Sequence, residues 1–443
     1  MTILLDNAKE ITEEDQTGTA SAAVVDATPA KARGHRTVYL INTPKYHMEV
    51  VIPFLHALSG LPDVDLTLWL SSTAANRWGI RPWLDLYAMP TGLKLRNVKD
   101  FSKSAQRGAT VPDLIFLTTC PEDIRKLRPS LQVLLEHGAN VIGIIHEARL
   151  FDLNNKSPYE KEIMFMRPWI LKGQWHLATL SEHVQKFVQQ NFAEFFQTGT
   201  QVTYSASVLY PVFKLPDERV QLETTKPFVT IIGALQQYRR DYAKIFEQYA
   251  RVRPQLDLVL VGNGCPLRAP RSIKNNLSYK RGLEYPQYFN QISKAVLILP
   301  SFATEHYVQS QASSTIATSV IAVTPALMTR RMLSAYAYLT EDAVWIQEDW
   351  ETEVEAISRI AELKQDSYME KKATMVNIRA KLINENKKTF EAKLAALDEH
   401  VLPRKRKVTF EIRAFDLSLA LSIAVSLPTL PLVLIILRYA FQN

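Results

Sequence analysis

A chain of 443 residues is too long for a single compact core, and it predicts two domains of about 200 residues each. Its 22% charged and 47% hydrophobic residues are ordinary for a globular protein, and its two cysteines, Cys120 and Cys265, are too far apart for a disulfide framework or a metal-binding motif. Cysteine usage therefore indicates a reducing compartment for the main body. The net charge of +7 is not clustered in the body, which favours an anionic small ligand or a lipid surface over nucleic acid.

The N-terminal segment, residues 1–34, carries six acidic and three basic side chains and no aromatic one. Such a segment cannot bury enough apolar surface to order itself, so we predict a disordered tail. The apolar run at residues 1–5 is too short for a secretory signal.

From residue 35 onward, apolar strand patterns alternate with helical patterns. This order predicts a parallel sheet with helices on both faces, and ligands in such sheets lie beyond the carboxyl ends of the strands. His146 and Glu147 follow a predicted strand directly, so His146 either caps the next loop or faces a substrate. Ser181 is a plausible N-cap for a helix, and Gly138 ends another. The expected strands are residues 37–41, 64–70, 113–118, 140–145 and 176–180, and the expected helices are 49–59, 122–137 and 181–196.

A polar link at residues 214–226 divides the chain into an N-terminal domain, 35–215, and a C-terminal domain, 227–400. The second half repeats the alternation. Residues 341–400 predict closing helices that could cross back over the first domain. The expected strands are 228–232, 256–261, 295–299 and 320–323, with a further segment at 277–282, and the expected helices are 284–293 and 309–319.

The segment 228–240 reads as a buried strand that stops at Gly233 and turns into a helix that runs to about residue 250. A helix N-terminus carries roughly half a positive charge and suits a phosphate. Arg239 and Arg240, expected one turn into that helix, could add charge-assisted bonds to a diphosphate. Every α/β domain contains several such units, so this one alone does not establish a phosphate site.

The C-terminal segment predicts a membrane anchor. Residues 416–438 enclose an uncharged apolar stretch long enough to span a bilayer, and residues 404–413 before it are basic. The positive charge places the body in the cytosol and predicts a single-pass protein of an endomembrane, the endoplasmic reticulum or Golgi, in preference to the plasma membrane. Pro428 and Pro431 would kink the helix, so a re-entrant hairpin that does not cross the bilayer is one alternative. A buried soluble helix is the other.

These motifs, in this order, resemble glycosyltransferases of the GT-B fold, specifically the retaining family four, over residues 37–400. The resemblance implies two Rossmann-like domains that face each other across a cleft, with a nucleotide-sugar between them. It is carried by residues 144–147 (Ile-Ile-His-Glu), 178–183 (Ala-Thr-Leu-Ser-Glu-His), 208–213 (Val-Leu-Tyr-Pro-Val-Phe), 231–235 (Ile-Ile-Gly-Ala-Leu), 260–264 (Leu-Val-Gly-Asn-Gly), Gly282 followed by 288–292 (Tyr-Phe-Asn-Gln-Ile), and 296–301 (Val-Leu-Ile-Leu-Pro-Ser).

The resemblance also implies roles for individual residues. Glu305 would position the donor sugar, and His146 would bind its hydroxyls from the opposite wall. Neither a metal nor a cofactor is expected beyond the donor substrate, a nucleotide-sugar such as a UDP- or GDP-sugar. The expected donor-binding residues are Gly233, Arg239, Arg240, Gly262, Asn263, Gly264, Ser301, Gln311 and Ser313.

Three departures from the family pattern bear on nucleotide binding. Ala234 stands where the family has an arginine, and the loop at residues 42–47 contains no glycine. Ser313 occupies the position of the second family glutamate, which holds a ribose, and Gln311 is the nearest polar replacement.

The sequence therefore predicts a membrane-anchored glycosyltransferase that transfers a sugar, with retention, to a lipid-linked or membrane-proximal acceptor, which would be a glycan or a lipid-linked molecule. Its partners would be the nucleotide-sugar, that acceptor and the lipid bilayer, without nucleic acid. The missing second glutamate favours an alternative, a catalytically degenerate GT-B scaffold that binds or activates a partner transferase. A third reading, a GT-B epimerase, fits the membrane segment least.

Overall fold

The computed structural model describes residues 35–88, 93–106, 111–152, 156–192, 197–198, 201–202, 206–216 and 226–399. The predicted disordered tail, basic segment and membrane helix (1–34, 404–413 and 416–438) lie outside these residues. Within the described part of the chain, no helix is both long enough and apolar enough to cross a bilayer.

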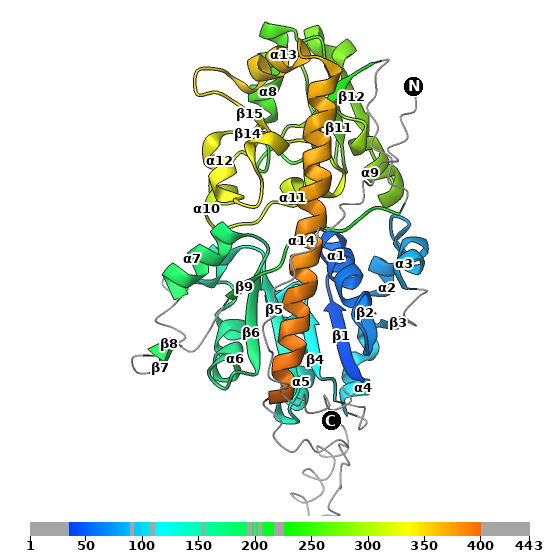
Figure 1. Ribbon diagram of the computed structural model, residues 1–443, viewed down its shortest axis with the longest axis vertical. Coiled ribbons are helices and arrows are strands. Elements are labelled where there is room, and N and C mark those ends of the chain that lie inside the picture. Colours follow the sequence, from blue (N-terminus) through cyan, green and yellow to red (C-terminus); the bar gives the residue numbers. More distant parts are fainter. Residues whose placement is uncertain are drawn as a thin grey trace, which may run out of the picture. The chain divides into compact units, whose positions relative to one another are not determined.

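The first lobe, residues 35–216, is built on a seven-stranded parallel sheet in the order β3-β2-β1-β4-β5-β6-β9 (Figure 1). This confirms the predicted parallel sheet and adds two short strands, β3 and β9. The strands are β1 (Arg36–Asn42), β2 (Val64–Leu70), β3 (Lys94–Asn97), β4 (Leu114–Leu117), β5 (Asn140–Ile145), β6 (Trp175–Thr179) and β9 (Ala206–Val208), and a separate pair is β7 (Gln197–Thr198) and β8 (Gln201–Val202).

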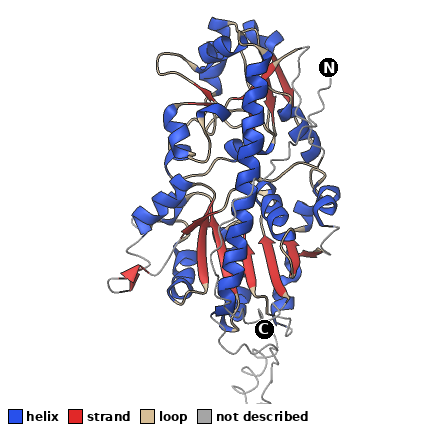
Figure 2. Cartoon of the chain, viewed as in Figure 1, coloured by secondary structure: helices blue, strands red, loops and turns tan. Residues whose placement is uncertain are grey.

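Both faces of this sheet are covered by helices (Figure 2). Strand β4 is apolar throughout because both of its faces are buried. Phe116 packs into one hydrophobic cluster, and its neighbours Ile115 and Leu117 pack into the other. The helices are α1 (Met48–Ser59), α2 (Ser72–Ala75), α3 (Ile80–Ala88), α4 (Phe101–Gln106), α5 (Cys120–Glu136), α6 (Glu160–Leu171) and α7 (Glu182–Phe192), with short 3₁₀ turns η1 (Val98–Asp100) and η2 (Ala148–Phe151).

The second lobe, from residue 226, contains a four-stranded parallel sheet in the order β12-β11-β10-β13. A bridge between Ile298 and Ala326 leads on to a further parallel pair, β14 and β15. The strands are β10 (Phe228–Ile232), β11 (Asp257–Val261), β12 (Leu277–Lys280), β13 (Leu297–Ile298), β14 (Leu327–Met328) and β15 (Trp345–Ile346). The helices are α8 (Tyr242–Val252), α9 (Tyr285–Ser293), α10 (His306–Gln309), α11 (Ser314–Ile321), α12 (Arg330–Ala335), α13 (Glu353–Ala361) and α14 (Gln365–Glu399), with 3₁₀ turns η5 (Arg271–Asn276) and η6 (Glu341–Ala343).

One predicted strand of this lobe is wrong. Residues 320–323 form the last turn of α11 and the bend after it, and the next strand, β14, begins at Leu327. Every residue of α11 after Ser314 is buried, so the helix can end in a continuous apolar run, residues 320–323, that resembles a buried strand.

Helix α14 is 35 residues long and packs on both lobes, which confirms the predicted crossing back (Figure 1). In the second lobe, the buried Lys372 donates hydrogen bonds to the carbonyl oxygens of Ser293 and Val323, at 2.8 and 3.2 Å. In the first lobe, Phe390 packs against Phe54 and Phe116, with ring centroids 6.1 and 5.5 Å away. This helix therefore ties the two lobes together.

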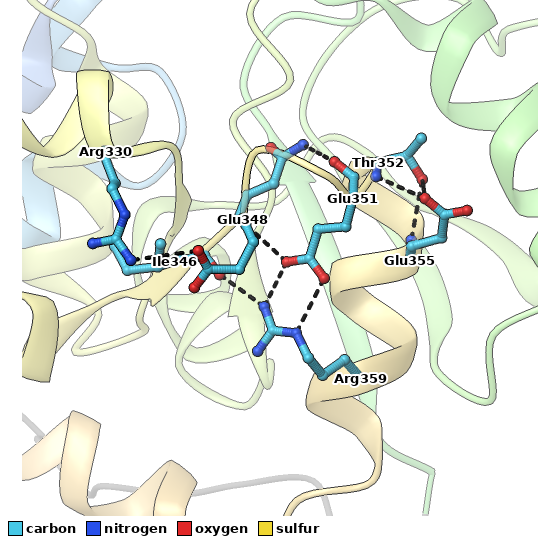
Figure 3. Close-up of polar contacts among 8 residues, drawn as sticks. Arg330, Ile346, Glu348, Glu351, Thr352, Glu355 and Arg359 are labelled. Atoms are coloured by element: carbon cyan, nitrogen blue, oxygen red, sulfur yellow. Dashed lines mark hydrogen bonds and ion pairs between the residues drawn. The ribbon is translucent and has the colours of Figure 1, made fainter.

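A salt bridge fixes the chain before α13 (Figure 3). The Arg359 guanidinium contacts both carboxylate oxygens of Glu351, at 2.6 and 3.1 Å, and donates to the carbonyl oxygen of Ile346. The Glu351 side chain is 1% exposed. The Glu351 hydrogen bond raises the pKa of Arg359. A capping box of Thr352 and Glu355 begins α13 at the same place.

Replacing Arg359 with methionine is expected to lower the free energy of unfolding by about 1–3 kcal/mol, because the Glu351 carboxylate would stay buried without its partner. Urea unfolding of the full chain measures this loss. The matched control is Lys381→Met, which breaks an exposed ion pair with Glu385 and should cost about 0.5 kcal/mol or less. Equal losses in the two variants would contradict the account.

Candidate functional site

A cavity of about 690 Å³ lies where the strands of both parallel sheets end. Loops that follow β1, β4 and β5 line it from the first lobe, and loops that follow β10, β11 and β12 line it from the second. Both sheets present their carboxyl ends to it, as expected for ligand sites in parallel α/β proteins.

The second-lobe floor of the cavity needs glycine at two places. Gly233 has φ 104°, a backbone conformation that residues with a side chain rarely adopt. No atom lies within 4 Å of the place that its Cβ would take, so the turn leaves open space there. A Cβ on Gly262 would lie 1.6 Å from the Gly233 carbonyl oxygen, so no other residue fits. Asn263 also lines the cavity, and its side-chain oxygen accepts a hydrogen bond from the Gly282 amide. The expected donor residues Gly233, Gly262 and Asn263 thus meet in one place.

Helix α8 begins later than the sequence predicts. Its first residue is Tyr242, and Asp241 caps it by accepting a hydrogen bond from the Lys244 amide. A carboxylate already occupies this helix end, so α8 does not offer the phosphate site expected after Gly233. Arg239 and Arg240 lie before the helix, in the loop from Gly233.

The two arginines nevertheless line the cavity. Arg239 is exposed, whereas Arg240 is 6% exposed and its guanidinium lies over the rings of Phe302 and Tyr307, 5.1 and 5.7 Å from their centroids. Burial lowers the pKa of Arg240. Its Nη2 donates to the Thr315 hydroxyl at 2.6 Å, and its Nε has no hydrogen-bond partner among the described residues.

The Arg240 guanidinium is thereby held at the N-terminus of α11. Ser313 is the N-cap of this helix, and its hydroxyl accepts from the Thr315 amide. Ser313, Ser314 and Thr318 line the cavity. A buried guanidinium beside the positive end of a helix dipole is an arrangement that suits an anion.

On the first lobe, His146 lines the cavity as predicted. Its Nε2 lies 2.6 Å from the carbonyl oxygen of Thr118, so this nitrogen carries the proton and Nδ1 is free to accept one. Burial, followed by repulsion from His47, lowers the pKa of His146 to about 3. His146 is therefore a neutral hydrogen-bonding group at pH 7.

A pair that the sequence analysis missed lies beside it. His47 lines the cavity with its ring centroid 4.3 Å from that of His146, and its Nδ1 is 3.0 Å from Oε1 of Glu49. Burial raises the pKa of Glu49, but the hydrogen bond from His47 and the other interactions that favour the carboxylate together outweigh burial, so the pKa lies below the usual value. The only sequence signal was a His-x-Glu pattern where the loop after the first strand enters α1.

Backbone contacts between the lobes form one edge of the cavity. The Ala312 amide donates to the His146 carbonyl oxygen at 3.1 Å, and Glu147 and Gln311 form an antiparallel bridge. The Gln311 carbonyl oxygen also faces Nε2 of His183, at 3.2 Å. Gln311, predicted as a donor residue, therefore lines the cavity next to Glu147.

Three predicted site residues are not among the residues that line the cavity. Glu305 is exposed and pairs with Arg331, with 2.6 Å between Oε2 and Nη2. Ser301 is buried and packs behind the loop of Arg240. Gly264 packs against Leu235, 2.8 Å from where a Cβ would lie. No group of three or more His, Cys, Asp or Glu in the described part of the chain is placed to hold a metal ion.

His146 also predicts how stability depends on pH. Its folded pKa lies near 3, whereas an unfolded histidine has a pKa of about 6.5. The unfolded chain binds the proton first, so the free energy of unfolding falls as the pH drops below about 6.5. Between pH 7 and pH 5 the wild-type protein should lose about 1–2 kcal/mol more stability than His146→Gln. Urea unfolding at both pH values measures this difference, and equal losses would contradict it.

The chain resembles solved structures in fold, although no family model matches its sequence and no curated protein is detectably similar to it. HepE of Anabaena, solved with UDP and glucose, has a TM-score of 0.56 at 10% identity, over 82% of this chain and all of HepE. UGT89C1 of Arabidopsis thaliana, complexed with UDP-L-rhamnose, has a TM-score of 0.50 at 12% identity, over 82% of this chain and all of UGT89C1. These neighbours are GT-B glycosyltransferases, and membership of retaining family four stays a prediction. The chain therefore has an α/β fold whose parallel sheets match the Rossmann-like domains of GT-B proteins.

Proposed function

We propose that this protein is a glycosyltransferase that uses a nucleotide-sugar donor. The observation that carries the proposal is the buried Arg240 at the N-terminus of α11, inside a cavity formed at the carboxyl ends of two parallel sheets. A nucleotide-sugar leaves a diphosphate behind as the glycosidic bond breaks, so its site needs fixed positive charge in a water-poor position.

The second-lobe wall offers that charge in several forms. Arg240 and the N-terminus of α11 would receive the diphosphate, with Arg239 and Lys280 at the edges of the same cavity. The bare Gly233 turn would let the nucleotide approach the backbone closely. HepE has been solved with UDP and with UDP-glucose, which supports uridine nucleotides as the first donors to test.

The first-lobe wall offers a group that can take a proton. His47 donates its Nδ1 proton to Glu49, so its Nε2 keeps a lone pair for an acceptor hydroxyl. The resemblance to family four implies retention. The His47–Glu49 pair favours the opposite outcome, because base-assisted displacement of the diphosphate by the acceptor oxygen inverts the anomeric carbon. NMR of the first product anomer decides between the two.

The acceptor's location depends on residues 416–438. We propose that this segment anchors the chain in an endomembrane, with the body facing the cytosol and the acceptor at the membrane. Its uncharged apolar stretch and the basic residues 404–413 support this. Fractionation of cells that express the full chain or a chain ending at residue 403 tests it: both forms staying with the membranes would contradict the proposed anchor.

A catalytically degenerate scaffold is the second candidate function, favoured by the exposed position of Glu305 outside the cavity and by Ser313 in place of a glutamate. A thermal-shift series with UDP- and GDP-sugars separates the candidates. A ligand present at 100 times its Kd should add about 2.7 kcal/mol of stability. Stabilisation by at least one nucleotide-sugar supports the transferase, and none by any of them supports the scaffold.

A further inference from the structure

A buried carboxamide at the end of β1 uses every hydrogen bond that it can form. Asn42, the last residue of this strand, is 0% exposed. Its Nδ2 donates to the carbonyl oxygens of Pro44 and Tyr46, both at 3.0 Å. Its Oδ1 accepts from the hydroxyls of Thr118 and Thr119, at 2.9 and 3.0 Å. Because carbonyl oxygens only accept, these partners fix which way the carboxamide faces.

The partners of Asn42 lie beside the two histidines of the cavity. Tyr46 directly precedes His47 in the chain. The Thr118 carbonyl oxygen accepts the hydrogen bond from Nε2 of His146, at 2.6 Å. The centroids of the two imidazole rings are 4.3 Å apart. One carboxamide therefore connects the loop that carries His47 to the residue that holds His146.

The backbone of His47 needs support from its surroundings. His47 has φ 67° and ψ 28°, in the left-handed region, and the loop at residues 42–47 contains no glycine. A residue with a side chain stays in this region only where neighbouring contacts impose it. Asp123 fixes the start of the loop by accepting a hydrogen bond from the Thr43 amide at 2.8 Å. Asn42 fixes the end of the loop, next to His47.

We propose that Asn42 is a positioning residue for the transfer reaction, which sets the place of the His47 imidazole relative to His146 and the cavity. Asn42 does not line the cavity, so it acts through His47 and touches no substrate. A base must lie within hydrogen-bond reach of the proton that it takes, and a displacement of about 1 Å can cost about 10²-fold in rate. This inference rests on the proposed function, in which His47 takes the acceptor proton.

Asn42→Asp tests the inference, because the carboxylate keeps the shape of the side chain but has no donor for the two carbonyl oxygens. We expect kcat for transfer of a labelled sugar to fall by about 10²-fold, with KM for the nucleotide-sugar within about twofold of the wild type. Asn42→Ser also lacks the two donors and carries no charge. It has the same expected result and replaces Asn42→Asp if the buried carboxylate unfolds the chain.

A double-mutant cycle shows whether Asn42 acts through His47. In a His47→Ala background, Asn42→Asp should change kcat by less than about twofold, because the group that it positions is already missing. Losses that multiply would overturn the inference. If His47→Ala keeps its kcat, the proposed base fails. If His47→Ala loses kcat and Asn42→Asp does not, only the role of Asn42 fails.

The matched control is Asn386→Asp. Asn386 is 1% exposed on α14, outside the cavity, and its carboxamide bonds to the backbone N–H and carbonyl oxygen of Tyr210, at 2.9 and 2.6 Å. Urea unfolding should show a loss of stability in this variant, as in Asn42→Asp, but its kcat should stay within about twofold of the wild type. Equal losses of kcat in the two variants would overturn the inference.

Nitrogen-15 NMR of the histidine side chains, on the full-length protein in detergent at about pH 8, gives a readout that needs no transfer assay. The His47 signals are identified by their absence in His47→Gln. In the wild type they should show a ring protonated at Nδ1, and Asn42→Asp should mix the two tautomers while Asn386→Asp does not. Unchanged His47 signals in Asn42→Asp would overturn the inference. UDP titration of the same samples tests the donor site separately.

Discussion

Replacing Arg240 with methionine is expected to lower kcat/KM for the nucleotide-sugar by about 10²- to 10³-fold, the usual loss when one donor to a developing anion is removed. Methionine keeps an unbranched apolar side chain at this buried position, but it removes the guanidinium that lies over Phe302 and Tyr307 and with it the charge at α11. Transfer of a labelled sugar, measured over a range of donor concentrations, gives this value.

The matched control for Arg240 is Arg251→Met. Arg251 is exposed on α8, 3.8 Å from Glu355, and lies outside the cavity. Its loss should leave kcat/KM within about twofold of the wild type, since surface substitutions away from a site have small effects. If Arg240→Met keeps the wild-type kcat/KM and unfolds like the wild type, Arg240 does not belong to the donor site.

Replacing His47 with alanine is expected to lower kcat by about 10²- to 10⁴-fold, the usual contribution of a general base. Glu49→Gln should produce a smaller loss, because it removes the carboxylate that fixes the histidine tautomer while the imidazole remains. Both variants should bind UDP as tightly as the wild type, since neither touches the second-lobe wall. Single-turnover transfer and UDP titration measure the two effects.

The control for His47 is His137→Ala, at the C-terminal end of α5 and outside the cavity. It should retain wild-type kcat. If His47→Ala also retains kcat and the product keeps the donor anomer, the leaving diphosphate takes the acceptor proton and the retention implied by the resemblance holds.

Much of the fold could be predicted from the sequence. Strands such as β4 and β10 are buried on both faces, so they appear as continuous apolar runs between turn residues, and the parallel order follows from the alternation with helices. The same rule wrongly predicted a strand at residues 320–323, where α11 ends, because a helix buried on all sides can also contain a continuous apolar run. The late start of α8 was missed because the cap, Asp241, follows a polar loop that also suits a helix.

The site was only partly predictable, because its residues meet through topology. His47 and His146 follow β1 and β5, strands about 100 residues apart in sequence that are separated by β4 in the sheet, so no local pattern reveals that their rings touch. Gly233, Gly262 and Arg240 were found because a strand that ends at a glycine is a local signal. The order of the motifs alone predicted Glu305 as a site residue. In the structure its carboxylate pairs with Arg331.

Hydrogen–deuterium exchange of the full chain with and without UDP, or GDP in a parallel series, tests the central claim most directly. The nucleotide should slow amide exchange at residues 233–236 and 313–318, the turn after β10 and the start of α11. The slowing should disappear in Arg240→Met and persist in Arg251→Met. Exchange that neither nucleotide changes, or protection confined to segments away from this wall, would contradict a donor site on the second lobe.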